Sequence, residues 1–156
     1  MLTIIIAIIV VILDQLTKYV AASQGYSHCS VINNFFYLNY SENTGMAWSL
    51  FSGHPYLLAI LGIVAVLLMV LYLYKNPPKK LESIIFGFII GGAIGNLIDR
   101  LFLGYVRDFL DFYIFGYDYP IFNVADSFIC VGVFLLLITS LINTNGEKDG
   151  KDSRTE

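Results

Sequence analysis

Residues 104–127 read GYVRDFLDFYIFGYDYPIFNVADS, and the rest of the chain is arranged around them. The stretch joins two long apolar segments and carries four aspartates: Asp108, Asp111, Asp118 and Asp126. A carboxylate at the boundary of a lipid bilayer is costly in free energy, so carboxylates found there usually have a function. We therefore expect a functional site in this stretch.

The composition is that of a membrane protein. The chain has 156 residues, of which 57% are hydrophobic and 13% are charged, and its mean hydropathy is +0.72. A soluble domain is less apolar and carries more charge. The net charge of −3 and the lack of a basic cluster with interleaved aromatics argue against nucleic-acid binding. Cys29 and Cys130 fall in a loop and in an apolar segment, so we expect no disulfide between them.

Four apolar segments approach the ~20 residues that cross a bilayer core. They are residues 2–22, 55–74, 81–103 and 123–142. The first is expected to be a retained span and not a cleaved signal peptide, because Asp14 and Lys18 interrupt it and no basic residue precedes it. The pattern predicts an all-α membrane protein with four transmembrane helices.

Two connecting regions, 23–54 and 104–122, should lie outside the membrane. Residues 31–40, VINNFFYLNY, are aromatic-rich, and their last six side chains alternate as in a strand. We expect a small extracytoplasmic β-sheet lying on the bilayer, with an interfacial loop or helix. Residues 1–143 would form a single four-helix membrane domain, followed by a polar cytoplasmic tail at 144–156.

The positive charges predict the orientation. They gather in the turn between the second and third spans and in the tail: Lys75, Lys79, Lys80, Lys148, Lys151 and Arg154. Beyond the helix ends, the other two connections hold only Arg107. Because short cytoplasmic loops carry an excess of Lys and Arg, both termini are expected in the cytoplasm.

A ridge of small residues runs along the third span. Gly87, Gly91 and Gly95 are four residues apart, and Asp99 continues the same face. Small residues at this spacing allow helices to pack closely in lipid. We expect a neighbouring helix on this ridge and polar surroundings at its outer end.

With this topology, polar residues converge at the outer bilayer boundary. They are Asp14, Asn43, Asn96, Asp99, Arg100, Asp108, Asn123 and Asp126. The inner halves of the spans are almost purely apolar, whereas a channel needs polar groups along its whole path. The pattern therefore favours a site that faces the membrane surface. Lys18, four residues after Asp14, either pairs with it or extends to the interface.

The residues allow three kinds of chemistry at this site. His28 and Cys29 are adjacent, so their side chains diverge and make a poor nucleophile–base pair. The aspartates could supply oxygen ligands to Mg²⁺, but their spacing matches no carboxylate metal motif, and Arg100 adds a competing positive charge. We expect neither a metal nor another cofactor.

A pair of carboxylates that shares one proton can hydrolyse a peptide bond without a metal. We expect Asp108 and Asp126 to form this pair. Asn123 is placed to cap the last span, which puts Asp126 in its first turn, where the helix dipole favours the ionised form. The pair should titrate as one coupled unit. Asp111, three residues after Asp108, is expected to be an interfacial surface charge.

Five ordered blocks carry a resemblance to a known family. They are DQLTK at 14–18, NTGMAW at 43–48, GNLIDR at 95–100, VRDFLDF at 106–112 and FNVADS at 122–127. Together they resemble the lipoprotein signal peptidases, the aspartic signal peptidase II family of bacterial inner membranes. Two positions depart from the family pattern: Trp48 replaces a usual Phe, and Arg107 stands where an apolar residue is common.

The resemblance implies a role for each matched residue. Asp108 and Asp126 match the catalytic pair. The matched supporting residues are Asp14, Lys18, Asn43, Gly45, Asn96, Asp99, Arg100 and Asn123. The implied substrate is a prolipoprotein whose lipobox cysteine carries a diacylglyceryl group, and cleavage would fall just before that cysteine.

The remaining expectations concern partners and alternatives. Membrane lipid and the signal peptides of lipidated prolipoproteins are the expected partners, with the signal helix beside the glycine ridge, and the enzyme is expected to be a monomer. Two alternatives remain from the residues alone: a Mg²⁺-dependent lipid phosphotransferase, and a non-catalytic scaffold that grips a partner helix.

Overall fold

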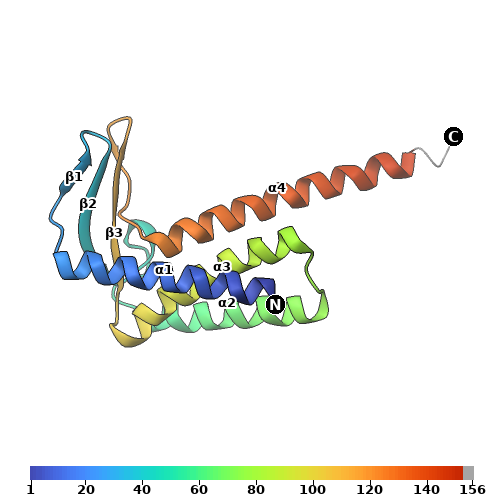
Figure 1. Ribbon diagram of the computed structural model, residues 1–156, viewed down its shortest axis with the longest axis horizontal. Helices are drawn as coiled ribbons and strands as arrows, with labels where there is room; N and C mark the ends of the chain where they lie inside the picture. Colours follow the sequence, from blue (N-terminus) through green and yellow to red (C-terminus); the bar gives the residue numbers. More distant parts are fainter. Residues whose placement is uncertain (153–156) are drawn as a thin grey trace.

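Four long helices form the body of the molecule. The computed structural model describes residues 1–152, with side chains through residue 142 apart from Ser49. The helices are α1 (Leu2–Gln24), α2 (Pro55–Lys75), α3 (Lys80–Phe102) and α4 (Val124–Asp152) (Figure 1). Each is long and apolar enough to cross a membrane, α4 over Val124–Ile142. The four predicted spans are therefore confirmed, and α4 continues past its span into the predicted polar tail.

Helix α3 lies at the centre and packs against the three other helices. Its glycines allow close approach on two sides. A Cβ added at Gly91 would lie 2.7 Å from Cβ of Val10 on α1, and one added at Gly92 would lie 2.5 Å from the backbone oxygen of Ala125 on α4. The predicted glycine ridge is thus confirmed as a packing surface. Because α1 occupies it, the expectation that a substrate helix lies there is wrong.

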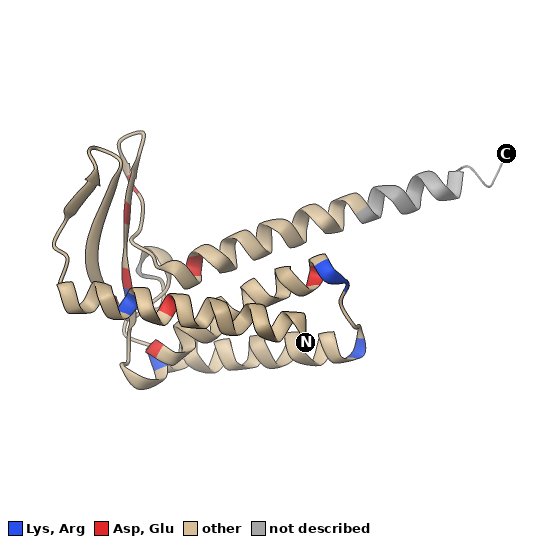
Figure 2. Ribbon diagram, in the orientation of Figure 1, with Lys and Arg blue, Asp and Glu red and all other residues tan. Residues whose placement is uncertain are grey.

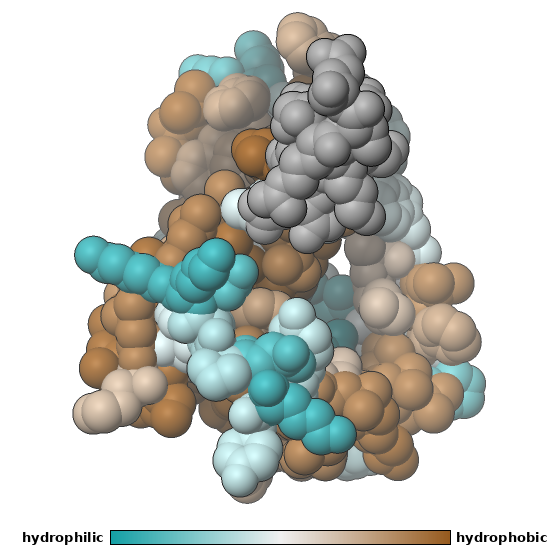
Figure 3. All heavy atoms as spheres, turned by 90° about the vertical axis from the view of Figure 1, so that its right-hand side faces the viewer, coloured by the Kyte–Doolittle hydropathy of each residue, from teal (hydrophilic) through white to brown (hydrophobic). Residues whose placement is uncertain are grey.

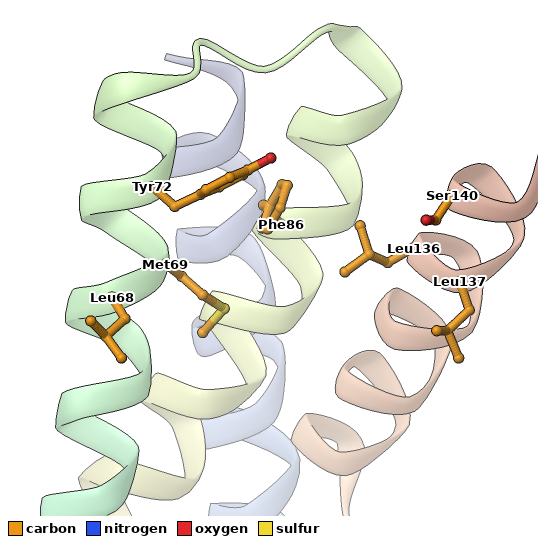
Figure 4. Close-up of a pocket in the computed structure, with 7 residues that line it drawn as sticks. All are labelled: Leu68, Met69, Tyr72, Phe86, Leu136, Leu137 and Ser140. Atoms are coloured by element: carbon orange, nitrogen blue, oxygen red, sulfur yellow. The ribbon is translucent and has the colours of Figure 1, made fainter. Parts of the chain in front are cut away.

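Helices α2 and α4 flank an open side of the bundle. Helix α4 leans away from α2 toward the end opposite the sheet (Figure 1). The groove between them has a volume of about 530 Å³. Its lining is almost entirely apolar: Leu68, Met69, Tyr72, Phe86, Leu136, Leu137 and Ser140 (Figure 4).

A four-stranded antiparallel sheet crosses the other end of the bundle (Figure 1). Its strands, in spatial order, are β1 (Cys29–Ile32), β2 (Phe36–Asn43), β3 (Val106–Ile114) and β4 (Tyr117–Asp118). The predicted alternating strand is confirmed by β2. The outer connection 104–122, for which the sequence predicted no strand, supplies β3 and β4, and the only short helix in the described part of the outer connections is η1 (Ala47–Ser49).

The register of the sheet brings the two outer connections together. Phe36 on β2 pairs with Phe112 on β3, and Ser41 pairs with Asp108. A bulge in β2 between Leu38 and Ser41 shifts the register by one residue, as bulges near functional sites often do. Asp108 thereby lies on the part of β3 that crosses the ends of the helices.

Charged residues separate to the two ends of the helices. Figure 2 shows acidic and basic groups where the helices meet the sheet and again at the α2–α3 turn, with few between them. Figure 3 shows the molecule from the end that carries this turn, where hydrophilic residues project toward the viewer and mostly hydrophobic residues surround them. Exposed apolar side chains such as Ile60 and Leu67 cover the outside of the helices. This is the distribution expected for helices in contact with lipid.

Candidate active site

The two aspartates of the predicted pair come from different elements. Asp108 lies on β3 and is 2% exposed, and Asp126 lies in the first turn of α4. Asn123 Nδ2 donates to Asp108 Oδ1 at 2.7 Å and to Asn96 Oδ1 at 3.1 Å. Asn96 Nδ2 in turn donates to Asp126 Oδ1 at 2.7 Å. Two carboxamides therefore join the two carboxylates into one network.

The start of α4 holds Asp126 in place. The side-chain oxygen of Asn123 accepts a hydrogen bond from the backbone N–H of Asp126 at 2.9 Å, and Asp126 Oδ2 accepts one from the backbone N–H of Asn123 at 3.3 Å. This reciprocal arrangement is a capping box, in which the third helical residue returns to the N-cap. The predicted cap at Asn123 is confirmed.

The loop after β2 is fastened over the site. Asn43 Nδ2 donates to Asp108 Oδ2 at 2.9 Å, while its oxygen accepts from the backbone N–H of Gly45 at 2.9 Å. The carbonyl of Gly45 accepts from Arg100 Nη2 at 3.1 Å. A Cβ at Gly45 would lie 2.7 Å from the carbonyl oxygen of Leu50, so a side chain there would force the loop open.

A buried ionic cluster supports the site from α1 and α3. Lys18 Nζ lies 2.9 Å from Asp14 Oδ2 and 3.4 Å from Asp99 Oδ2, and all three side chains are 0% exposed. It also donates to Asn96 Oδ1 at 2.8 Å. Lys18 therefore does not extend to the interface, and its pairing with Asp14 is the correct alternative. Asp14 Oδ1 accepts from the backbone N–H of Ala125 at 2.9 Å, which ties α1 to the first turn of α4.

Two further members of the cluster were missed by the sequence analysis. Gln15 donates to Asp99 Oδ1 at 3.1 Å and to the carbonyl of Gly95 at 3.1 Å. Arg107 donates to both oxygens of Asp99, from Nη2 at 2.6 Å and from Nε at 3.1 Å. The balance of charges could have indicated Arg107. Asp14 and Asp99 carry two negative charges, Lys18 supplies only one positive charge, and a second cation is needed to balance them.

Asp111 is not the surface charge that the sequence predicted. It is 1% exposed and accepts from Asn39 Nδ2 at 3.1 Å. Nδ1 of His28 lies 3.4 Å from the same carboxylate oxygen, and the imidazole ring stacks on Tyr37 with centroids 4.1 Å apart. The stacked histidine covers Asp111, because the connection between α1 and β1 folds back onto the sheet.

Burial shapes the acid–base chemistry of Asp108. Removal from water, reinforced by the negative charge of Asp126, raises the pKa of the Asp108 carboxyl to about 7. Hydrogen bonds from Asn43 and Asn123 oppose this shift. The group can therefore hold or release a proton near neutral pH, as a general acid must. Among the described residues, no three His, Cys, Asp or Glu side chains are grouped so that they could hold a metal ion.

Four helices able to cross a membrane, with two aspartates linked through Asn96 and Asn123 at one end, are the architecture expected of an aspartic peptidase of the membrane. A family model described as Signal peptidase (SPase) II matches residues 6–142. The chain therefore belongs to the signal peptidase II family, as the five sequence blocks predicted, and it is a multi-pass bacterial membrane protein.

Relatives and solved structures agree with this assignment. A lipoprotein signal peptidase of Bacillus pumilus is 41% identical over 149 residues, covering 93% of this chain and 96% of the relative. One from Staphylococcus aureus is 40% identical, with 94% and 92% covered. A bacterial membrane enzyme solved by the in meso method at 2.3 Å resolution has a TM-score of 0.85 at 37% identity, with 92% of this chain and 90% of that chain covered. A second, at 1.9 Å resolution, has a TM-score of 0.80 at 38% identity, with 89% and 92% covered.

Proposed function

We propose that this protein removes the signal peptide from diacylglyceryl-modified prolipoproteins, with Asp108 and Asp126 as its catalytic pair. The observation that carries the proposal is the network in which Asn123 and Asn96 join the two carboxylates. The relatives' name, lipoprotein signal peptidase, supports the substrate class.

In this mechanism the two carboxylates divide the work. One carboxylate of the pair is ionised and takes a proton from water, while the other is protonated and donates to the scissile carbonyl oxygen as the water oxygen attacks the carbonyl carbon. The pKa of Asp108, about 7, allows it to hold the shared proton near neutral pH. The tetrahedral intermediate then collapses: the C–N bond breaks, the leaving amine receives the proton taken from water, and a hydroxyl proton of the intermediate returns to the carboxylate that protonated the carbonyl oxygen.

Arg100 is suited to hold the substrate backbone near the pair. Its Nη2 is used by the carbonyl of Gly45, but its buried Nε has no hydrogen-bond partner among the described residues. A buried donor left unpaired is costly, so a substrate carbonyl would bind favourably to this nitrogen if a rearrangement of the site made it accessible. Asn43, Gly45, Asn96, Asp99, Asn123, Asp14 and Lys18 act as the supporting residues of the site.

The groove between α2 and α4 suits the apolar part of a signal peptide. Leu136, in the groove lining, follows Asp126 by ten residues, which is about 15 Å along a helix. The apolar region of a signal peptide has about 7–15 residues. A helical signal peptide whose scissile bond lies beside Asp126 would therefore place its apolar region in this groove.

The proposed orientation puts both termini in the cytoplasm and the catalytic pair near the surface of the outer leaflet, in a monomer of the bacterial inner membrane. Cysteine labelling tests it, after Cys29→Ser and Cys130→Ala remove the native thiols. An impermeant reagent added to intact cells should label Gly116→Cys and not Asn76→Cys. Labelling of Asn76→Cys from outside would overturn the orientation.

The activity is tested with purified protein, a lipidated precursor and a chelator in detergent. Asp108→Asn and Asp126→Asn should each lower cleavage by about 10²–10⁴-fold, because each removes one proton-transfer group. The double variant should be hardly slower than either single one, since the two groups act as a unit. The matched control is Asp118→Asn, at an exposed position on β4, which should cleave normally.

Other outcomes identify the alternatives. Loss of cleavage in the presence of chelator would show that the peptide hydrolysis needs a metal ion, contrary to the proposed mechanism. Binding of precursor without any cleavage by the native protein would favour the scaffold. Full activity of Asp108→Asn, with loss in Asp118→Asn, would show that the pair is assigned to the wrong carboxylates.

A further inference from the structure

Arg107 connects three elements at the edge of the site. Its guanidinium grips the carboxylate of Asp99 on α3 through Nη2 and Nε, at 2.6 and 3.1 Å. Its backbone N–H donates to the same carboxylate at 3.0 Å, and Nη2 also donates to Gln15 Oε1 on α1 at 2.8 Å. Two parallel bonds from a guanidinium to a carboxylate set distance and orientation together, which a lysine cannot do.

The charge of Arg107 completes the buried cluster. Asp14 and Asp99 carry two negative charges with no exposed side-chain surface, and Lys18 supplies one positive charge. The side chain of Arg107 is 14% exposed and supplies the second. With it, two anions face two cations. Without it, one of the two buried negative charges would lack a balancing positive charge, a condition that is strongly unfavourable.

Two chains of contacts lead from Arg107 to the catalytic pair. The first is covalent: Asp108 is the next residue on β3, and neighbouring side chains on a strand point to opposite faces. Holding Arg107 against α3 therefore sets the position from which Asp108 projects. The second passes from Asp99 through Lys18 to Asn96, whose amide donates to Asp126 Oδ1.

We propose that Arg107 is a positioning residue for catalysis in this chain, acting on Asp108 through the strand and on Asp126 through Asp99, Lys18 and Asn96. The proposal rests on the assignment of Asp108 and Asp126 as the catalytic pair. Arg107 touches neither the water nor the scissile bond in this scheme.

The test separates kcat from KM for a lipidated precursor in Arg107→Met and Arg107→Lys. Methionine keeps the apolar stem and removes the guanidinium, so kcat should fall by up to about 10²-fold, the cost of misplacing a reacting group by roughly 1 Å. KM should stay unchanged, because the groove between α2 and α4 is untouched. Lysine keeps the charge and loses the two-pronged grip, so it should restore part of kcat.

A second variant keeps the test decisive if Arg107→Met folds poorly. Adding Asp99→Asn removes the negative charge left unbalanced by the loss of the guanidinium, so thermal stability in detergent should recover while kcat remains low. Lys75→Leu, which removes one cation at the far end of α2, is the control for net charge and should match the native enzyme.

The proposal fails if folded Arg107→Met, or the double variant, has native kcat, which would make Arg107 a purely structural residue. It also fails if KM rises while kcat is unchanged, which would make it a binding residue. The native enzyme and Asp108→Asn, measured alongside, report on the proposed function separately. Native cleavage that is lost in Asp108→Asn upholds that function whatever Arg107 does.

Discussion

Gly91→Ala tests the closest contact between α1 and α3. The added Cβ would lie 2.7 Å from Cβ of Val10, 2.8 Å from the carbonyl oxygen of Ala7 and 3.0 Å from its Cα. Ordinary contact begins at 3.4 Å, so the helices must separate by about 0.7 Å. Two of the three obstructing atoms are backbone and cannot rotate away. Overpacking of this kind costs about 1–3 kcal/mol of unfolding free energy.

Gly62→Ala on α2 is the matched control, since nothing lies within 4 Å of its added Cβ. Both variants gain the same helix propensity of about 1 kcal/mol, so the difference between them isolates the steric term. Thermal unfolding in detergent should therefore rank Gly91→Ala below Gly62→Ala. Cleavage by Gly91→Ala should also fall, because α1 carries Asp14, which accepts from the first turn of α4. Equal stability of the two variants would refute the close packing of α1 on α3.

The remaining predictions concern protons and the buried Asp111. Cleavage should decline as pH rises above about 7, where Asp108 loses its proton, and a rate that keeps rising to pH 9 would contradict this assignment. The pKa of Asp108 is raised from 3.8 in the folded protein, so its contribution to stability is fully present below about pH 4 and is lost as pH rises through about 7. The melting temperature of the native protein should therefore be lower at pH 8 than at pH 5. The difference should be smaller in Asp108→Asn. Asp111→Asn should keep native kcat but lower the unfolding free energy by about 1 kcal/mol, because it weakens the contact with His28; loss of cleavage in a stable variant would place Asp111 in the catalytic machinery.

Features that depend on local sequence were predictable. Hydropathy alone gives the four spans, because a bilayer imposes a length and a composition on each helix. The cap at Asn123 follows from its position three residues before Asp126, and the ridge on α3 follows from glycine spacing. Each of these patterns acts within a few residues of chain.

Features that depend on distant contacts were not predicted. Nothing near Arg107 indicates that Gln15, 92 residues earlier in the chain, lies within 2.8 Å of its guanidinium. The local sequence predicts Asp111 as a surface charge, because the residue that covers it, His28, is distant in the chain. The strand β3 did have a local signal, since VRDFLDFYI is rich in aromatic and β-branched residues and lies between Gly104 and Gly116.

The central place of α3 has a consequence for biogenesis. Helices α1 and α2 leave the ribosome before the helix on which both of them pack. Until α3 arrives, Asp14 and Lys18 must neutralise each other within α1, which their spacing of four residues permits. Asp108 and Asp126 are synthesised later still, on the strand and the helix that follow α3. With Asp108 and Asp126 as the proposed catalytic pair, a nascent or half-inserted chain carries no proteolytic centre, and activity in the membrane begins only when the last helix has joined the bundle.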